Sequence, residues 1–235
     1  RFSHWQLLKG LYGIAREAVQ RAAPAHLVVA IDPVNFEKPY TGALQGVSTV
    51  MKSTPPGPGG EKRLTSGYPA ITATVVNLAQ PVITYANWFS YRTADFVSEP
   101  WEIYRALRTT RTLFPHLLLR FVGDAGLDNQ LTFQQVDRLH SQFIFRAGHT
   151  NRLVDVYEVR GFANPRLQRW EPQEHLAELA DSVPWSHRLP VAFQHARTTR
   201  RVTVRLGWLQ LRIPETQQVV WALVILALRL QDRIE

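Results

Sequence analysis

Apolar residues in the first half of the chain follow two spacings, one typical of buried strands and one typical of helices. Residues 27–31 and 117–122 are nearly continuous β-rich apolar runs, as expected of strands that are buried on both faces. Residues 70–76 and 82–85 have the same character and predict two strands joined by a turn. Residues 2–22 instead place apolar side chains at helical spacing and predict a helix that ends before a proline.

Helix and strand signals continue toward the middle of the chain. Ser98 with Pro100 is a typical helix start, with the serine as N-cap and the proline in the first turn. Asp128 is predicted to cap a further helix that extends to His140, and residues 142–146 predict another short strand. Because buried strands alternate with helices, this part of the sequence predicts an α/β domain.

The later part of the chain has mainly the pattern of β-strands. Residues 202–206 and 209–213 each alternate apolar and polar positions, and Gly207-Trp208 between them predicts a hairpin. Residues 172–181 are the exception and predict a short helix. We therefore expect an N-terminal helical segment, an α/β core and a mainly β part, with boundaries at 1–25, 26–152 and 153–235.

Charge adds a preference for a polyanionic partner. The chain has 27 lysines and arginines against 19 acids, a formal net charge of +8. Residues 188–212 contain six arginines and no acid, and such a segment suits a nucleic-acid backbone, whose neutralisation releases counterions. The alternative is that these arginines simply face solvent while the apolar positions between them face a core.

Other composition features exclude some classes of function. The chain has no cysteine, which excludes a disulfide framework, a thiol nucleophile and a cysteine-ligated zinc site. The longest apolar stretch, residues 219–228, is far shorter than the ~20 residues of a membrane helix. The eight histidines show no zinc-like clustering.

Two aspartates carry the candidate chemistry. Asp32 follows the first long apolar run and Asp124 follows another. Carboxylates at the ends of neighbouring strands can hold divalent metal ions against a phosphodiester, because Mg²⁺ prefers hard oxygen ligands. Each aspartate alone could equally be a turn residue at the end of a strand, which is common.

The motifs around these aspartates, in their order, resemble the DDE transposases of bacterial insertion sequences, the cut-and-paste group with an RNase H-like catalytic domain. The resemblance covers about residues 26–225. The matching pieces are Asp32 followed by Lys38-Pro39, Gly67-Tyr68-Pro69, the segment 85–99, Asp124-Ala-Gly-Leu-Asp128, and Phe143-Ile-Phe-Arg146 with Arg152.

This resemblance implies a fold, a reaction and a set of site residues. The fold would be α/β, an RNase H-like mixed sheet flanked by helices, with a β-rich insertion after the second aspartate. Asp32, on the central strand, would bridge two Mg²⁺ or Mn²⁺ ions, and Asp124 would bind one of them. The reaction would be DNA strand cleavage and strand transfer at transposon ends. The residues expected to contact DNA, from the family pattern and the basic segment, are Lys38, Arg146, Arg152, Arg200, Arg201 and Arg205.

The resemblance also implies partners and a location. Double-stranded DNA would be bound at the transposon ends and at the target, by a homodimer on paired ends. The location would be the bacterial cytoplasm, with nucleoid association on DNA. For Lys38 the alternative is a solvated loop lysine, and for Arg146 an ion pair with Asp155 or Glu158.

The transposase family has a third catalytic acid, a glutamate, and this chain has no matching motif for it. In the family it lies in a Tyr-x-x-Arg-Trp-x-x-Glu signature on a helix beyond the insertion, and no segment here matches it. We expect the chain to end before that helix. Two alternatives to a transposase therefore stay open: a catalytically incomplete DNA-binding remnant, and a metal-dependent nuclease of the same fold. The family often has arginine after the second aspartate, where this chain has Ala125.

Overall fold

The chain folds into two compact units, residues 1–148 and 149–235. The structure is a computed structural model. It describes residues 4–41, 43–52, 63–148, 153–159, 168–175, 185–195, 198–213 and 217–227.

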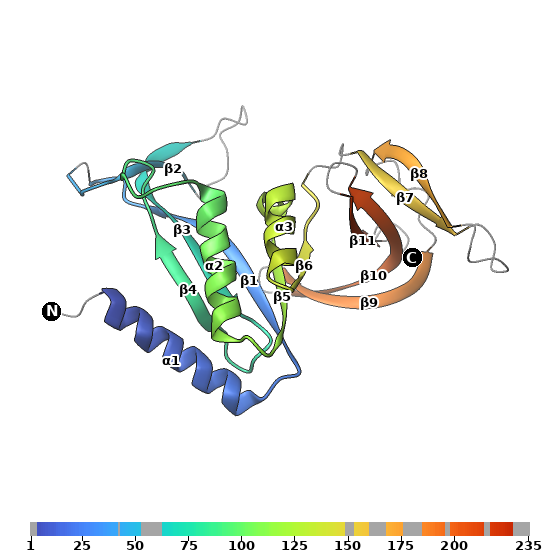
Figure 1. Cartoon of the computed structure of the whole chain (residues 1–235), viewed down its shortest axis with the longest axis horizontal. Coiled ribbons are helices and arrows are strands. Elements are labelled where there is room, and N and C mark those ends of the chain that lie inside the picture. The colour runs from blue at the N-terminus through green and yellow to red at the C-terminus, as the bar shows by residue number, and fades with distance from the viewer. Residues whose placement is uncertain are drawn as a thin grey trace. The chain divides into compact units, whose positions relative to one another are not determined.

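The first unit combines a mixed β-sheet with three α-helices (Figure 1). Its helices are α1 His4–Ala22, α2 Glu99–Leu113 and α3 Gln130–Arg138, together with the short 3₁₀ helix η1 Ala125–Leu127. Its strands are β1 His26–Glu37, β2 Ser48–Met51, β3 Leu64–Val75, β4 Val82–Trp88, β5 Leu118–Gly123 and β6 Gln142–Phe145.

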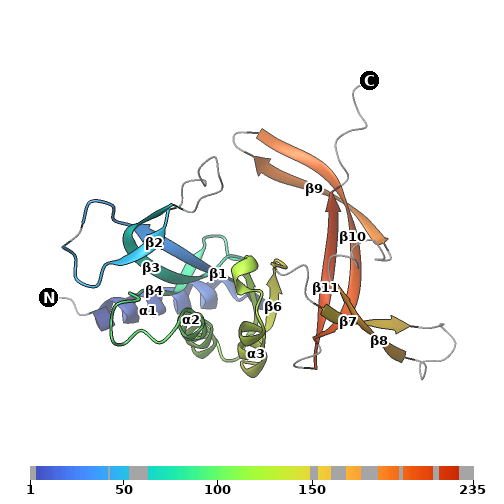
Figure 2. The same cartoon turned by 90° about the horizontal axis from the view of Figure 1, so that it is seen from above.

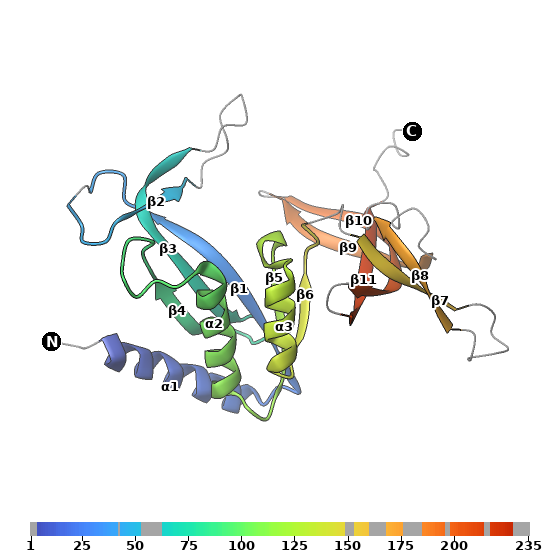
Figure 3. The ribbon, with the colours of Figure 1, turned by 45° about the horizontal axis from the view of Figure 1, so that its top comes forward.

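Strand β1 occupies the centre of this sheet. The strand order is β2-β3-β1-β5-β6, and β4 also pairs with β3. β1 runs antiparallel to β3 and parallel to β5, and β5 runs parallel to β6. Figure 3 shows β1 between β3 and β5. The first unit is therefore an α/β domain, as the apolar pattern predicts, and its mixed sheet is flanked by helices.

The three helices of the first unit lie on one face of its sheet (Figure 2). Alternate residues of β1, namely Leu27, Val29 and Ile31, are buried in the core beneath them. Leu107 of α2 and Phe121 of β5 are fully buried in the same cluster. Because successive strand residues point to opposite faces, the residue after Ile31 belongs to the face that these helices do not cover.

Several predictions from the apolar pattern are confirmed. Residues 2–22 contain α1, and the two strands predicted around residues 70–76 and 82–85 are the paired β3 and β4. Helix α2 begins where the serine and proline indicated: the Ser98 side chain accepts a hydrogen bond from the Trp101 backbone N–H at 3.3 Å. Local capping chemistry is readable from the sequence because it involves residues only three positions apart.

The apolar run of residues 27–31 predicts a strand that ends at Asp32-Pro33, because proline cannot continue the hydrogen-bonded ladder. This predicted end is wrong. β1 continues to Glu37, and Pro33 pairs with Ile71 of β3. β5 pairs with β1 only as far as Ala30. Beyond that point one edge of β1 has no ladder partner from β5, and proline is tolerated where a strand has such an edge.

The predicted cap of the helix after β5 is wrong by one residue. Asn129, not Asp128, is the N-cap of α3, and its Oδ1 accepts a hydrogen bond from the Thr132 N–H at 2.9 Å. Asparagine and aspartate cap helices about equally well, so the residue type could not separate the two neighbours.

The described residues of the second unit form a five-stranded sheet. Its strands are β7 Leu153–Val159, β8 Gln168–His175, β9 Trp185–His195, β10 Thr198–Ile213 and β11 Gln218–Ala227. The order is β11-β10-β7-β8, and β9 pairs with β10. All the pairs are antiparallel.

Two local predictions for the second unit are wrong. Gly207-Trp208 is not a hairpin but the middle of β10, and a register shift against β9 falls between Leu206 and Gly207. A β-bulge of this kind changes the phase of the alternation, which explains why the sequence resembled two strands.

The predicted helix at residues 172–181 is also wrong as far as it is described, because Pro172 to His175 belong to β8. β8 ends the strand order beside β7 and has a register shift near this proline. Edge strands and bulges are the places where strands tolerate proline. In the described part of the chain no helix has both the length and the apolar character needed to cross a membrane.

Candidate functional site

The fold brings Asp32 and Asp124 close together. Asp32 lies on β1 and Asp124 follows β5 directly, and these two strands are parallel neighbours. In their register Ala30 pairs with Val122, so each aspartate lies two residues beyond the last paired position. The two residues are 92 positions apart in the sequence, and only the sheet makes them neighbours.

The two carboxylates interact as like charges. Partial burial, and in addition the negative charge of Asp124, raise the pKa of Asp32 above its ordinary value. Both side chains remain exposed. Among the described residues, no lysine or arginine forms an ion pair with Asp32. Two neighbouring carboxylates that have no cationic partner in the described part of the chain form a site that a divalent cation would stabilise, since it favours the charged form of both.

Asp124 is held in place by its local backbone. It is the N-cap of η1, and its Oδ1 accepts a hydrogen bond from the Gly126 N–H at 2.9 Å. The preceding Gly123 cannot be replaced without movement, because a Cβ there would lie 2.2 Å from Leu127 Cδ1 and 3.2 Å from the Ile31 carbonyl oxygen. Gly123 thus allows β5 to approach β1 closely, and this approach sets the position of Asp124.

Asp128 of the same motif has a structural role. It is only 4% exposed, and its Oδ2 accepts a hydrogen bond from the Gly148 N–H at 2.7 Å. Its carboxylate therefore fastens the chain after β6 to the turn after β5. The sequence predicted a helix cap at Asp128, and its bond to Gly148, twenty residues away in the chain, could not be predicted from it.

The structure brings Arg146, but not Lys38, toward the aspartate pair. The Arg146 N–H donates to the carbonyl oxygen of Gly123 at 3.3 Å, which places Arg146 beside the residue that precedes Asp124. Lys38 lies six residues beyond Asp32, and because β1 stays extended to Glu37 this separation is roughly 20 Å along the strand.

The remaining candidate DNA contacts belong to the second unit. Arg200, Arg201 and Arg205 lie on β10, where they pair with Phe193, Ala192 and Arg188 of β9. Arg152 lies outside the described residues, and so do the side chains of Asp155 and Glu158, the alternative partners of Arg146.

The sequence analysis did not single out Glu102, a buried acid of the first unit. This α2 residue is 2% exposed, and its carboxylate accepts hydrogen bonds from Asn87 Nδ2 at 3.0 Å and from Arg105 at 3.1 Å. The available signal was the pair of opposite charges at i and i+3 on a helix. That spacing does not reveal burial, which depends on β4.

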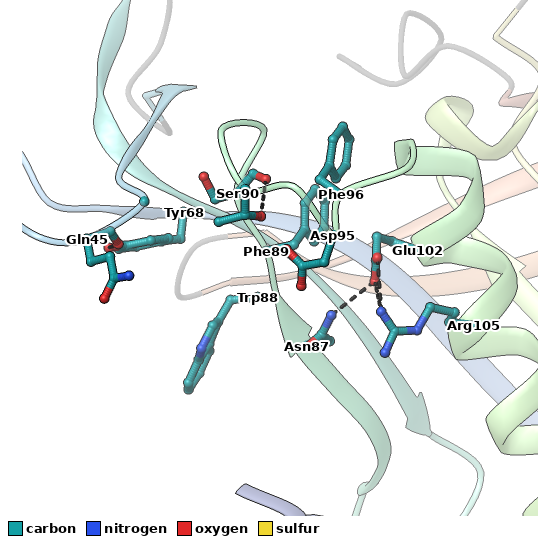
Figure 4. Close-up of a pocket in the computed structure, with 12 residues that line it drawn as sticks. Gln45, Tyr68, Asn87, Trp88, Phe89, Ser90, Asp95, Phe96, Glu102 and Arg105 are labelled. Carbon is teal, nitrogen blue, oxygen red and sulfur yellow. Dashed lines mark hydrogen bonds and ion pairs between the residues drawn. The ribbon is translucent and has the colours of Figure 1, made fainter.

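Glu102 lines a pocket of about 400 Å³ that is separate from the aspartate pair (Figure 4). Aromatic side chains form much of its wall, and neither Asp32 nor Asp124 lines it. Figure 4 shows Asn87 and Arg105 directed at the Glu102 carboxylate. Because this carboxylate is already paired, we assign it to the support of α2 on β4.

The donor set at Asp32 and Asp124 suits Mg²⁺ or Mn²⁺, which prefer carboxylate oxygens and keep several waters. Within the described part of the chain, no group of three or more histidine, cysteine or acidic side chains is arranged to hold a metal ion. Among the described residues, Asp32 and Asp124 would therefore be the protein ligands of such a metal ion. A comparison of the chain with protein-family models and with curated protein sequences finds no match.

Proposed function

We propose that this chain is the RNase H-like core and β-rich part of a DDE-type transposase, which cleaves and joins DNA with Mg²⁺ or Mn²⁺. The observation that carries the proposal is the pair of exposed aspartates on neighbouring parallel strands, close enough for one charge to raise the pKa of the other. The proposed partner is double-stranded DNA, bound by a homodimer on paired transposon ends.

The arrangement of the sheet supports this proposal. Asp32 lies on the central strand and Asp124 follows its parallel neighbour, as the family resemblance implies. Asp32 also follows Ile31, which is buried beneath the helices, so it belongs to the opposite face of the sheet. A large substrate such as DNA needs this kind of access.

The second unit supports a role in binding DNA. Arg205 and Arg188 are direct partners in the antiparallel register of β10 and β9. Residues 188–212 contain six arginines and no acid, and a segment of this composition suits a polyanion. This observation favours DNA binding whether or not the chain cleaves DNA.

Asp32 and Asp124 would act by holding a divalent cation and by orienting it toward the substrate. A divalent cation bound there would supply charge stabilisation for displacement at phosphorus. Asp32 and Asp124 would fix its position, and Asp124 is itself oriented by its bond to the Gly126 N–H. Arg146, positioned by its backbone bond to Gly123, would bind a phosphate oxygen of the substrate.

The first test measures the binding of Mn²⁺ to the chain by electron paramagnetic resonance. We expect the variants Asp32→Asn and Asp124→Asn each to weaken binding at least about tenfold. Asp95→Asn, which changes an exposed acid of the first unit, should bind as the unchanged chain does. Equal binding by all four proteins would contradict the proposed site.

The second test separates cleavage from binding alone. The chain is incubated with supercoiled plasmid and Mg²⁺, and DNA binding is measured in parallel over a range of salt concentrations. Nicking that Asp32→Asn abolishes, with DNA binding retained, would support the enzyme. Binding without nicking would identify the incomplete DNA-binding protein, and nicking without strand transfer would identify a nuclease.

A further inference from the structure

A second pocket of the first unit, of about 510 Å³, lies among α1, β4 and α2 and contains none of the proposed catalytic residues. Its volume falls within the range of small-molecule sites. Its chemistry is set by six residues, listed from the N-terminus: Tyr12, Arg16, Tyr85, Trp101, Arg105 and Arg108.

Three arginines give this pocket a positive charge. Arg16 comes from α1, and Arg105 and Arg108 lie three residues apart on α2, which places them on one helix face. Arg105 is paired with Glu102 at 3.1 Å. In the part of the chain that the structure describes, neither Arg16 nor Arg108 has a carboxylate partner. Guanidinium groups without a carboxylate partner that line one pocket are suited to bind a phosphate.

Aromatic rings form the other half of the lining. Trp101 is 42% exposed and packs against Tyr104, with ring centroids 5.6 Å apart. Trp101 and Arg105 are four residues apart on α2, and Tyr12 and Arg16 are four residues apart on α1. Each helix therefore presents an aromatic ring one turn before an arginine. A planar base can stack on such rings while its phosphate reaches the arginines.

Tyr85 supplies a buried hydroxyl at the wall of the pocket. Its side chain is 5% exposed, and its Oη makes no hydrogen bond of normal geometry among the described residues, although the Glu102 carboxylate lies near it and is a potential acceptor. Burial, and to a smaller extent the nearby Glu102, raise the pKa of Tyr85 to about 12 against the opposing effect of Arg105. The phenol therefore keeps its proton at neutral pH and can donate to a ligand. Buried hydroxyls without a partner are uncommon in folded proteins.

We propose that this pocket binds a nucleotide, with its phosphate on Arg16 and Arg108 and its base against Trp101 and Tyr12. The same chemistry fits a free mononucleotide and one nucleotide of a single DNA strand. Because the pocket shares no residue with the Asp32–Asp124 pair, this binding is independent of the metal site and goes beyond the proposed reaction.

The test is calorimetric titration of the whole chain with 2′-deoxyadenosine 5′-monophosphate. We expect Arg16→Gln and Arg108→Gln each to weaken binding about tenfold, since each loses a charge-assisted bond. Trp101→Ala should also weaken it. Arg21→Gln, an identical change of charge on an exposed position of α1 outside the pocket, is the matched control. Thermal unfolding curves establish that each variant is folded.

The outcomes separate the proposal from simple charge attraction. Equal losses in Arg21→Gln and Arg16→Gln, or no binding at millimolar nucleotide, would overturn it. Inorganic phosphate that binds as well as the nucleotide would overturn the assignment of the aromatic rings. A short thymidine oligonucleotide that binds more tightly than the mononucleotide, with the same dependence on Arg16 and Arg108, would identify a DNA strand as the source. Weaker binding of the oligonucleotide would identify the free nucleotide.

Discussion

Two acidic regions of the first unit have opposite surroundings. Glu102 is buried, and both of its carboxylate oxygens accept hydrogen bonds from Arg105 or Asn87. Asp32 is exposed, and the like charge of Asp124 helps to raise its pKa. A paired, buried carboxylate stabilises the fold, whereas converging unpaired carboxylates cost stability and can be retained for binding.

Burial alone therefore does not identify a functional acid. The more buried acid, Glu102, fastens α2 to β4, and the more exposed pair is the candidate metal site. Substitutions test this contrast, because loss of a structural acid should lower the free energy of unfolding, whereas loss of a binding acid should lower the affinity for metal.

The largest effect on stability is expected for Glu102→Ala. The substitution removes the acceptor of Asn87 and Arg105 inside the core, and we expect the free energy of unfolding to fall by about 2–4 kcal/mol. Arg105 is about half exposed, which keeps the loss below that of a fully buried ion pair. Urea denaturation measures the change. Glu102→Gln, which keeps the shape and one acceptor, should lose less, and an equal loss would show that the charged carboxylate and its hydrogen bonds, rather than packing, account for the effect.

An intermediate effect is expected for Asp128→Ala. The carboxylate of Asp128 is buried and bonds the Gly148 N–H, so its removal should lower the free energy of unfolding by about 1–3 kcal/mol. Mn²⁺ affinity should change little, because Asp128 is not part of the proposed site. A large loss of metal affinity without a loss of stability would make Asp128 a ligand and contradict its structural assignment.

The smallest effect, and the opposite sign, is expected for Asp32→Asn. The pKa of Asp32 is raised in the folded protein above its ordinary value of 3.8, so the folded state favours the neutral carboxyl. The unchanged chain therefore loses stability as the pH rises through the folded pKa, and the variant does not. At neutral pH the variant should be the more stable by less than about 1 kcal/mol, because Asp32 is exposed.

The pH dependence provides the control for that prediction. Below pH 3.8 the carboxyl is neutral in both states, and the difference between the two proteins should disappear. Thermal unfolding at several pH values measures this difference in stability. The comparison is Asp137→Asn, which changes an exposed acid on α3. A variant that is less stable at neutral pH would mean that Asp32 has a stabilising partner.

Local features of the fold could be predicted from the sequence because they depend on neighbours in the chain. The apolar runs predicted β5, and the cap at Ser98 predicted the start of α2. Predictions failed where pairing partners decide the outcome. β1 passes through Pro33 because β5 leaves one of its edges without a ladder partner, and β10 passes through Gly207 because a bulge against β9 absorbs the change of phase.

By itself the sequence determined that the first unit is α/β, that the second part is β-rich and basic, and that Asp32 and Asp124 are the candidate residues. Only the tertiary structure decided that these two aspartates are neighbours, that Lys38 lies farther along β1, and that Glu102 is buried and paired. The physical reason is that strand pairing and helix packing join residues far apart in the chain. The resulting desolvation and charge interactions depend on distances in space, which a sequence pattern does not contain.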